Sequence, residues 1–297
     1  MQDSVSPEAT GRLPADTLRG ELTAAEKSLA GEPWSNLEGG RSNRSWMIET
    51  SNGKIVCKLY DTRSSTPLFP NDDAAEYMAL MWLRGTGLAP EPVRRVVTSL
   101  GTCLIYRFVA GRPWKHGAGA VGELLARLHG LKAPNGLRRL RGGSAALRAI
   151  GNAILDECPE SRAGHLRRLA PGDPMVDAET PVFLHGDVVP GNIIQDAHGL
   201  TLIDWQCPAV GDPSEDLATF LSPAMQVLSG RKPLSPAQES EFLSGYDNPA
   251  VAHRFAALRP LYHWRMAAYC LWKSARGDAS YEPALQLELA ALGATDK

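Results

Sequence analysis

The chain has 297 residues, of which 43% are hydrophobic and 22% charged, so it is long enough to bury a core without disulfide or metal staples. Its formal net charge of −2 argues against nucleic acid or an anionic membrane as a partner, because both usually require a basic surface.

The five cysteines are scattered and never form a C-x-x-C motif, so we expect buried free thiols. The N-terminal segment is polar, without a hydrophobic signal core, and no apolar run reaches the ~18 residues of a membrane span. With reduced cysteines, these features predict a cytoplasmic protein. We expect a monomer or a homodimer.

In chain order, residues 1–20 predict a loose tail or a poorly defined first helix, and "TAAEKSLAG" predicts a short helix that ends at Gly31. Two β-type runs, "SWMIET" and "IVCKLY", flank an Asn-Gly dipeptide, which indicates a hairpin. The segment "DDAAEYMALMWLRGTG" predicts a helix that begins at Asp72 and ends at Gly85, and "PVRRVVTS" and "TCLIYRFV" predict another strand pair.

The pattern then becomes helical, apart from the short apolar runs "VFLH", "NIIQ" and "LTLIDW". We therefore predict an α+β fold with two lobes. The first lobe, residues 1–108, is a small antiparallel sheet with one helix, and the second, residues 109–297, is larger and mainly helical.

The segment "FLHGDVVPGNIIQDAHGLTLIDW", residues 183–205, places oxygen-bearing side chains at the ends of short strands. Asp187 follows the first strand, Asn192 begins the second, and Asp204 ends the third. Two carboxylates and an amide are hard oxygen ligands that suit Mg²⁺. Phosphoryl transfer also requires a carboxylate that accepts the proton of the acceptor hydroxyl. The alternative is that these are ordinary turn and cap residues.

The motifs "HGD-x4-N", "IDW" and "GDPSEDLA" resemble the aminoglycoside phosphotransferase and choline kinase family, which has the bilobal protein-kinase-like fold. The resemblance spans roughly residues 35–275. It implies that Asp187 is the catalytic base, that Asn192 and Asp204 bind Mg²⁺, and that ATP (or GTP) is the phosphate donor. It also implies that His185 and Asp216 support the catalytic loop.

The first lobe resembles the nucleotide-binding half of that family. In "NLEGGRSN", before a strand, the resemblance implies a phosphate-binding loop made of Gly39, Gly40, Arg41, Ser42 and Asn43. It also implies that Lys58 contacts phosphate and forms an ion pair with Glu76, and that backbone groups near Tyr106 and Phe108 bind the base. The alternative is an edge-strand lysine and a solvated glutamate.

The acceptor is expected to be a small molecule with a hydroxyl group. A predicted helix at 250–275 carries Tyr262, Arg265, Tyr269 and Trp272 on one face, and such an aromatic wall suits a quaternary ammonium or a flat heterocycle. Core packing is the alternative explanation of this stripe. Glu215 is a further candidate for a substrate contact.

These features favour a kinase for a metabolic amino alcohol or heterocyclic alcohol such as choline, ethanolamine or thiamine. An aminoglycoside or amino-sugar kinase is an alternative, although the acidic residues that would bind a polycation show no clustering along the chain. A third hypothesis, from another class, is a catalytically inactive relative that binds nucleotide or a partner protein.

Overall fold

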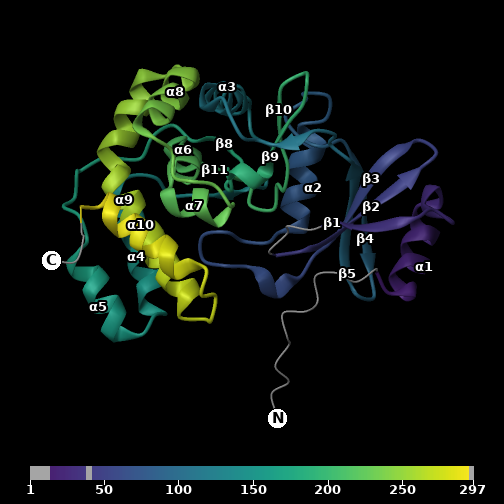
Figure 1. Ribbon diagram of the computed structural model, residues 1–297, viewed down its shortest axis with the longest axis horizontal. Helices are drawn as coiled ribbons and strands as arrows, with labels where there is room; N and C mark the ends of the chain where they lie inside the picture. Colours follow the sequence, from purple (N-terminus) through teal and green to yellow (C-terminus); the bar gives the residue numbers. More distant parts are fainter. Residues whose placement is uncertain (1–13, 38–41, 294–297) are drawn as a thin grey trace, which may run out of the picture. The chain divides into compact units, whose positions relative to one another are not determined.

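The computed structural model describes residues 14–37 and 42–293 (Figure 1). The chain divides into two compact units, unit 1 at residues 1–111 and unit 2 at residues 112–297. Within the described ranges, no helix is both long enough and apolar enough to span a bilayer.

Unit 1 is built on a five-stranded sheet with the strand order β1-β2-β3-β5-β4, in which every neighbouring pair is antiparallel. The strands are β1 (Trp34–Leu37), β2 (Arg44–Thr50), β3 (Gly53–Leu59), β4 (Pro92–Thr98) and β5 (Gly101–Arg107). The predicted hairpin is present: β2 and β3 pair from Arg44↔Leu59 to Thr50↔Gly53, and Gly53 has the positive φ of 103° that the turn requires.

One face of this sheet is covered by α1 (Asp16–Ala25), which packs beside β4 (Figure 1). Leu18 and Leu22 lie one helical turn apart and are buried in a core with Trp34, Trp46 and Ile48. Residues 16–20, for which the sequence left a loose tail or a poorly defined helix open, form the first part of α1, so this lobe has a helix in addition to the one expected after Asp72. The burial of Leu18 against the sheet stabilises the extra helix.

The helix α1 also ends earlier than expected. Glu26 is extended, with φ −135° and ψ 96°, and separates α1 from a short 3₁₀ helix, η2 (Lys27–Leu29). A second 3₁₀ helix, η3 (Thr62–Ser64), follows β3.

The helix α2 (Asp73–Trp82) begins as the sequence predicted, because the Asp72 carboxylate accepts the N–H groups of Ala74 and Ala75 at 3.0 and 2.9 Å. Side chains alternate along β3. Cys57 and Leu59 therefore lie in the core that contains α1, while Lys58 contacts α2 on the other face.

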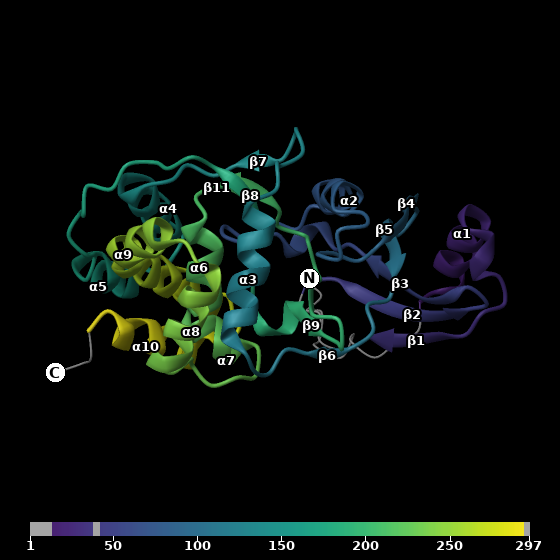
Figure 2. The ribbon, with the colours of Figure 1, turned by 90° about the horizontal axis from the view of Figure 1, so that it is seen from above.

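Unit 2 is mainly helical. Its helices are α3 (Ala118–His129), α4 (Ser144–Asp156), α5 (Glu160–Arg168), α6 (Ser214–Leu221), α7 (Pro223–Leu228), α8 (Pro236–Tyr246), α9 (Pro249–Ser274) and α10 (Tyr281–Ala291). The long helix α9 packs against α4, α6 and α10. The helices α3 and α8 lie side by side (Figure 2), and a Cβ added to Gly245 of α8 would lie 2.1 Å from the carbonyl oxygen of Gly119.

Two three-stranded sheets interrupt these helices, with the orders β10-β9-β6 and β7-β11-β8. The strands are β6 (Arg112–Pro113), β7 (Arg138–Arg139), β8 (Val182–Leu184), β9 (Ile193–Gln195), β10 (Leu200–Leu202) and β11 (Ala209–Gly211). A 3₁₀ turn, η4 (Pro190–Asn192), connects β8 to β9, so the segment singled out from the sequence forms strand–loop–strand–turn–strand.

Candidate active site

The loop between β8 and η4 carries Asp187 and brings it against Asn192. The side-chain amide of Asn192 donates hydrogen bonds to the backbone oxygen of Asp187 at 3.0 Å and to its carboxylate Oδ2 at 3.1 Å. Because the Asn192 nitrogen is directed at Asp187, the amide oxygen Oδ1 remains as the group that suits a cation.

Asp204 follows β10 and has a positive φ of 62°, a left-handed conformation that aspartate tolerates better than most residues. The preceding residue, Ile203, donates its N–H to the carbonyl oxygen of Asn192 at 2.8 Å. The backbone therefore brings Asp204 to the strand end that carries Asn192. Unusual backbone conformations of this kind cluster at functional sites.

The side chains of Asn192 and Asp204 fit Mg²⁺, since an amide oxygen and a carboxylate are hard oxygen donors. Over residues 14–37 and 42–293, no group of three or more His, Cys, Asp or Glu side chains is arranged to hold a metal ion. A magnesium ion bound by Asn192 and Asp204 would thus complete its shell with water and phosphate oxygens, as Mg²⁺ commonly does.

The buried carboxylate of Asp216, on α6, holds the backbone of this loop. Its oxygens accept the N–H groups of His185 and Gly186, each at 2.8 Å, and Oδ2 lies 3.2 Å from Nε2 of His129. Burial alone would raise the pKa of Asp216, but the hydrogen bond and the electrostatic attraction from His129, together with the backbone N–H of His185, hold that pKa below its ordinary value.

His185 connects the loop to β10 through both ring nitrogens. Nδ1 accepts the N–H of Asp187 at 3.2 Å, and Nε2 donates to the carbonyl oxygen of Ile203 at 3.1 Å. These partners require a neutral imidazole with its proton on Nε2. The ring also packs against Trp205, with centroids 4.5 Å apart. His185 therefore braces the loop beside Asp187.

Gly186 is required by the path of the loop. Its φ is +81°, and a Cβ at this position would lie 2.2 Å from the carbonyl oxygen of Cys207. Any other residue would push the loop that carries Asp187 away from the segment that follows Asp204.

In unit 1, the ion pair expected from the sequence is present. Lys58 Nζ lies 2.6 Å from Glu76 Oε2, and the two residues are 3% and 1% exposed. The hydroxyl of Tyr60 donates to the same carboxylate oxygen, and the tyrosine ring lies 4.9 Å from the ammonium. Glu76 is thus a buried residue that orients Lys58, and the solvated-glutamate alternative is wrong.

The predicted phosphate-binding loop lies partly outside the described residues, which do not include Gly39, Gly40 and Arg41. The side chain of Asn43 forms a reciprocal amide pair with Asn71, with both bonds at 2.8 Å, and accepts the N–H of Asp61 at 3.1 Å. The carbonyl oxygen of Ser42 accepts the Ser64 hydroxyl at 2.8 Å. The Asn43 side chain therefore anchors the loop after β3. The sequence did not predict this contact.

At the end of β5, where backbone groups near Tyr106 and Phe108 were expected to bind the base, the pairing with β3 continues. Tyr106 pairs with Val56 in the sheet, and the N–H of Phe108 donates to the carbonyl oxygen of Lys54 at 3.0 Å. The sheet pairing therefore extends one residue beyond β5, and the Phe108 N–H forms a hydrogen bond within unit 1.

A family model described as "Phosphotransferase enzyme family" matches residues 33–261, well over half of the chain. The chain belongs to this phosphotransferase family. Among curated proteins, none matches the sequence significantly.

Solved structures of similar fold cover nearly all of this phosphotransferase. A choline/ethanolamine kinase family protein from Mesorhizobium loti has a TM-score of 0.63 and 19% identity, over 94% of this chain and 93% of that one. A macrolide 2′-phosphotransferase from Brachybacterium faecium has a TM-score of 0.55 and 19% identity, over 96% and 100%. A thermostable mutant of an aminoglycoside phosphotransferase, in ternary complex with ADP and hygromycin B, has a TM-score of 0.63 and 15% identity, over 93% and 99%. The predicted α+β, protein-kinase-like fold class is confirmed.

Most of the proposed acceptor-binding residues of this phosphotransferase are packed inside unit 2. Arg265 donates two hydrogen bonds to Glu215, at 3.0 and 2.6 Å, and the Tyr262 hydroxyl lies 2.7 Å from that of Ser214. Tyr269 is 3% exposed. Core packing therefore accounts for these positions, and the interpretation of the stripe as an aromatic wall has no support from their placement.

Trp272 lies at the C-terminal end of the stripe and is half-buried. Its ring nitrogen donates to Glu157 at 2.8 Å, and the Arg276 guanidinium lies 3.9 Å from the ring centroid. The ring face is therefore already covered by a cation of this chain.

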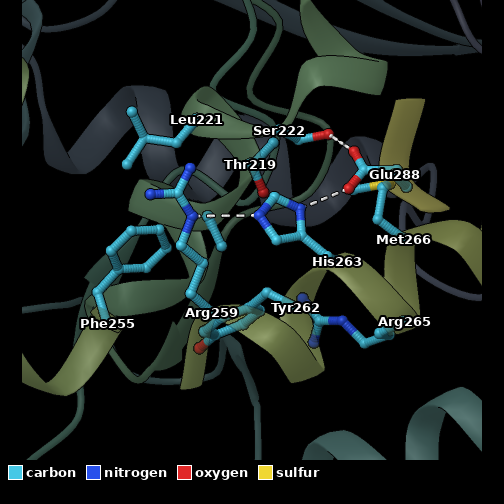
Figure 3. A pocket seen from close by; sticks show the side chains of 11 residues that line it. Thr219, Leu221, Ser222, Phe255, Arg259, Tyr262, His263, Arg265, Met266 and Glu288 are labelled. Carbon is cyan, nitrogen blue, oxygen red and sulfur yellow. Dashed lines mark hydrogen bonds and ion pairs between the residues drawn. The ribbon is translucent and has the colours of Figure 1, made fainter. Parts of the chain in front are cut away.

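A pocket among α6, α9 and α10 is lined by Tyr262 and Arg265 of the stripe, among other residues (Figure 3). His263 contacts Glu288 at 2.6 Å through Nδ1, and its Nε2 accepts from Arg259 at 3.2 Å. The remaining space is about 10 Å³, which is room for one water molecule. This pocket is too small for an acceptor substrate.

Tyr60, His129 and Tyr246 are contacts of the candidate site that were not predicted from the sequence. His129 ends α3 and contacts the Tyr246 hydroxyl of α8 at 2.8 Å through Nδ1, while its Nε2 faces Asp216. Tyr60 follows Lys58 by two positions, and this alternation was the available signal that both side chains lie on one face of the strand. His129 lies four residues after Leu125, on the apolar stripe of its helix. This spacing was the available signal that the histidine is buried.

Proposed function

We propose that the chain is an ATP-dependent kinase that transfers the γ-phosphate to a hydroxyl group of a small molecule. The observation that best supports this is the braced loop, in which Asp216 and His185 hold the backbone and Asn192 holds the Asp187 carboxylate. Phosphoryl transfer depends mostly on such positioning, because little covalent chemistry is left for the protein.

In this reaction Asp187 takes the proton of the acceptor hydroxyl while the hydroxyl oxygen bonds to the γ-phosphorus. The bond from that phosphorus to the oxygen that bridges to the β-phosphate breaks, and ADP leaves. A Mg²⁺ ion bound to Asn192 and Asp204 would neutralise phosphate charge.

Unit 1 is the proposed nucleotide-binding half. Lys58, oriented by Glu76, binds phosphate oxygens, and backbone groups near Tyr106 and Phe108, other than the Phe108 N–H, bind the base. The donor is ATP, or GTP, in line with the ADP complex of the similar aminoglycoside phosphotransferase.

Unit 2 is the proposed catalytic and acceptor-binding half. The similar structures include a choline/ethanolamine kinase family protein, a macrolide phosphotransferase and an aminoglycoside phosphotransferase, so this fold serves small acceptors of several kinds. Because the aromatic stripe is packed, it does not favour an amino alcohol over an amino sugar. The acceptor is therefore proposed only as a small hydroxyl compound.

A coupled assay of ADP release with a panel of acceptors tests the function. The panel contains choline, ethanolamine, thiamine, amino sugars and aminoglycosides, each with and without Mg²⁺. We expect acceptor-dependent turnover with at least one of them. If no nucleotide binds and no member is turned over, the proposed function is wrong.

The Asp187→Asn variant tests the assigned base. We expect kcat to fall by about 10²- to 10⁴-fold, the usual contribution of a general base, while nucleotide affinity stays within about threefold. The matched control is Asp196→Asn, in the β9–β10 turn, where the side chain accepts the N–H groups of His198 and Gly199. An Asp187→Asn variant with full activity would reject the assignment.

A further inference from the structure

Tyr60 lies on the same face of its strand as Lys58. Its N–H donates to the carbonyl oxygen of Thr102 at 2.9 Å, which extends the β3–β5 pairing past Leu59. The side chains of Lys58 and Tyr60 therefore point the same way, as residues two apart on a strand do. Tyr60 is 4% exposed, as deeply buried as the ion pair beside it.

Lys58 and Tyr60 bind one oxygen of Glu76. The Lys58 ammonium lies 2.6 Å from Oε2, and the Tyr60 hydroxyl donates to the same atom. The Tyr60 ring lies 4.9 Å from the ammonium, within the range of a cation–π contact. Three buried side chains thus form one cluster, in which Tyr60 contacts both the Lys58 ammonium and the Glu76 carboxylate.

The second donor matters when Lys58 binds a phosphate. To reach phosphate oxygens, the ammonium has to share or weaken its contact with Glu76. A buried carboxylate is destabilised when the contact with its cation weakens, and the ion pair therefore resists this change. A hydroxyl that stays on Oε2 lowers that cost, because it still donates to Glu76 when the ammonium moves toward phosphate.

We propose that Tyr60 is a positioning residue for nucleotide binding. Its hydroxyl holds Glu76, and through it α2, while the Lys58 ammonium turns toward the phosphate oxygens of ATP. This inference rests on the proposed kinase function, since it assigns a role within the same phosphate-binding group. Tyr60 is thus a third member of the group formed by Lys58 and Glu76.

The Tyr60→Phe variant removes the hydroxyl and keeps the ring, so the core packing and the contact between ring and ammonium remain. We expect KM for ATP, and Kd for a non-hydrolysable ATP analogue, to rise about tenfold, the effect of one hydrogen bond to a charged group. We expect kcat at saturating ATP to change less than about twofold. A purely structural role would instead lower the unfolding temperature and leave KM for ATP unchanged.

The matched control is Tyr77→Phe, which removes a hydroxyl from a half-buried side chain at the position after Glu76 on α2. We expect its KM for ATP to equal that of the wild type. A double variant tests whether Tyr60 acts through Glu76. In a Glu76→Gln background, Tyr60→Phe is expected to change KM for ATP by less than about twofold, because the carboxylate through which Tyr60 acts is already absent.

Two outcomes separate the inference from the function that it rests on. If the wild type binds the ATP analogue, Lys58→Met does not, and Tyr60→Phe binds like the wild type, the role of Tyr60 is wrong and the kinase assignment survives. If the wild-type chain binds no nucleotide, the proposed function itself is overturned.

Discussion

At the scale of single residues, the carboxylate of Asp216 organises the loop that carries Asp187. It is 0% exposed and accepts two backbone N–H groups of the loop. His129 approaches the same carboxylate and is itself bonded to Tyr246, so the loop is linked to α3 and α8. A buried charge with this many donors is stabilising only while all of its partners remain in place.

The Asp216→Asn variant is expected to lose about 2–4 kcal/mol of unfolding free energy at pH 7, because an amide NH₂ would oppose a backbone N–H. The pKa of Asp216 is lowered in the folded chain. Its stabilisation is therefore complete above the ordinary aspartate pKa of about 3.9 and is lost as pH falls through the folded value.

Urea unfolding of wild type and variant from pH 7 to pH 3 measures this dependence. We expect the difference in unfolding free energy to shrink as the pH falls below about 4. A difference that stays constant over the whole range would show that the charge of Asp216 contributes nothing. Asp196→Asn, whose side chain lies in an exposed turn, serves as the control.

At the scale of secondary structure elements, the contact between α3 and α8 depends on glycine. A Cβ on Gly122 would lie 2.2 Å from the carbonyl oxygen of Phe242, and one on Gly245 would lie 2.1 Å from that of Gly119. The two backbones are therefore nearly in contact. His129 and Tyr246 lie on these same helices, so the close approach also aligns the residues that reach Asp216.

The Gly245→Ala variant is expected to destabilise the chain by about 1–3 kcal/mol or more, because the colliding atoms belong to rigid helix backbone. Gly164→Ala on α5 is the matched control. Its added Cβ would meet only the flexible ends of Glu160 and Arg168, so the better helix propensity of alanine is expected to add up to about 1 kcal/mol. Urea unfolding checks both, and equal effects would contradict this account of the helix contact.

At the scale of the whole molecule, the five cysteines are free, as expected from the sequence, and their burial differs between positions. Cys57, Cys103, Cys207 and Cys270 are buried, and Cys158 is half-buried. Burial raises the pKa of the Cys158 thiol. The four buried thiols are therefore protected from reagents, whereas a reagent can reach Cys158 slowly.

A thiol-reactive reagent is expected to label one thiol of the native chain and all five after unfolding. Cys158→Ser should remove the native-state labelling. Because the thiolate is the reactive form and the pKa is raised, labelling of the native chain should accelerate as the pH rises above about 8.5. Rapid native-state labelling of two or more thiols would mean that the core opens more readily than the packing indicates.

The local features of the fold were readable from the sequence. The hairpin followed from Asn52-Gly53 and the start of α2 from Asp72, because turn and cap chemistry act over a few residues. The Lys58–Glu76 pair was expected from the resemblance. The start of α1 stayed open between a tail and a helix, because its evidence is the burial of Leu18 against distant strands rather than any local cap.

The sequence by itself determined the order and chemical type of the groups in the candidate site, since Asp187, Asn192 and Asp204 lie within one short strand–loop–strand segment. Only the tertiary structure decided that Asn43 pairs with Asn71, that Tyr60 shares Glu76 with Lys58, and that most of the stripe on α9 is core. The physical reason is that a hydrogen bond between distant segments leaves no periodic pattern in the sequence. An aromatic stripe on a helix likewise looks the same whether other helices or a ligand cover it.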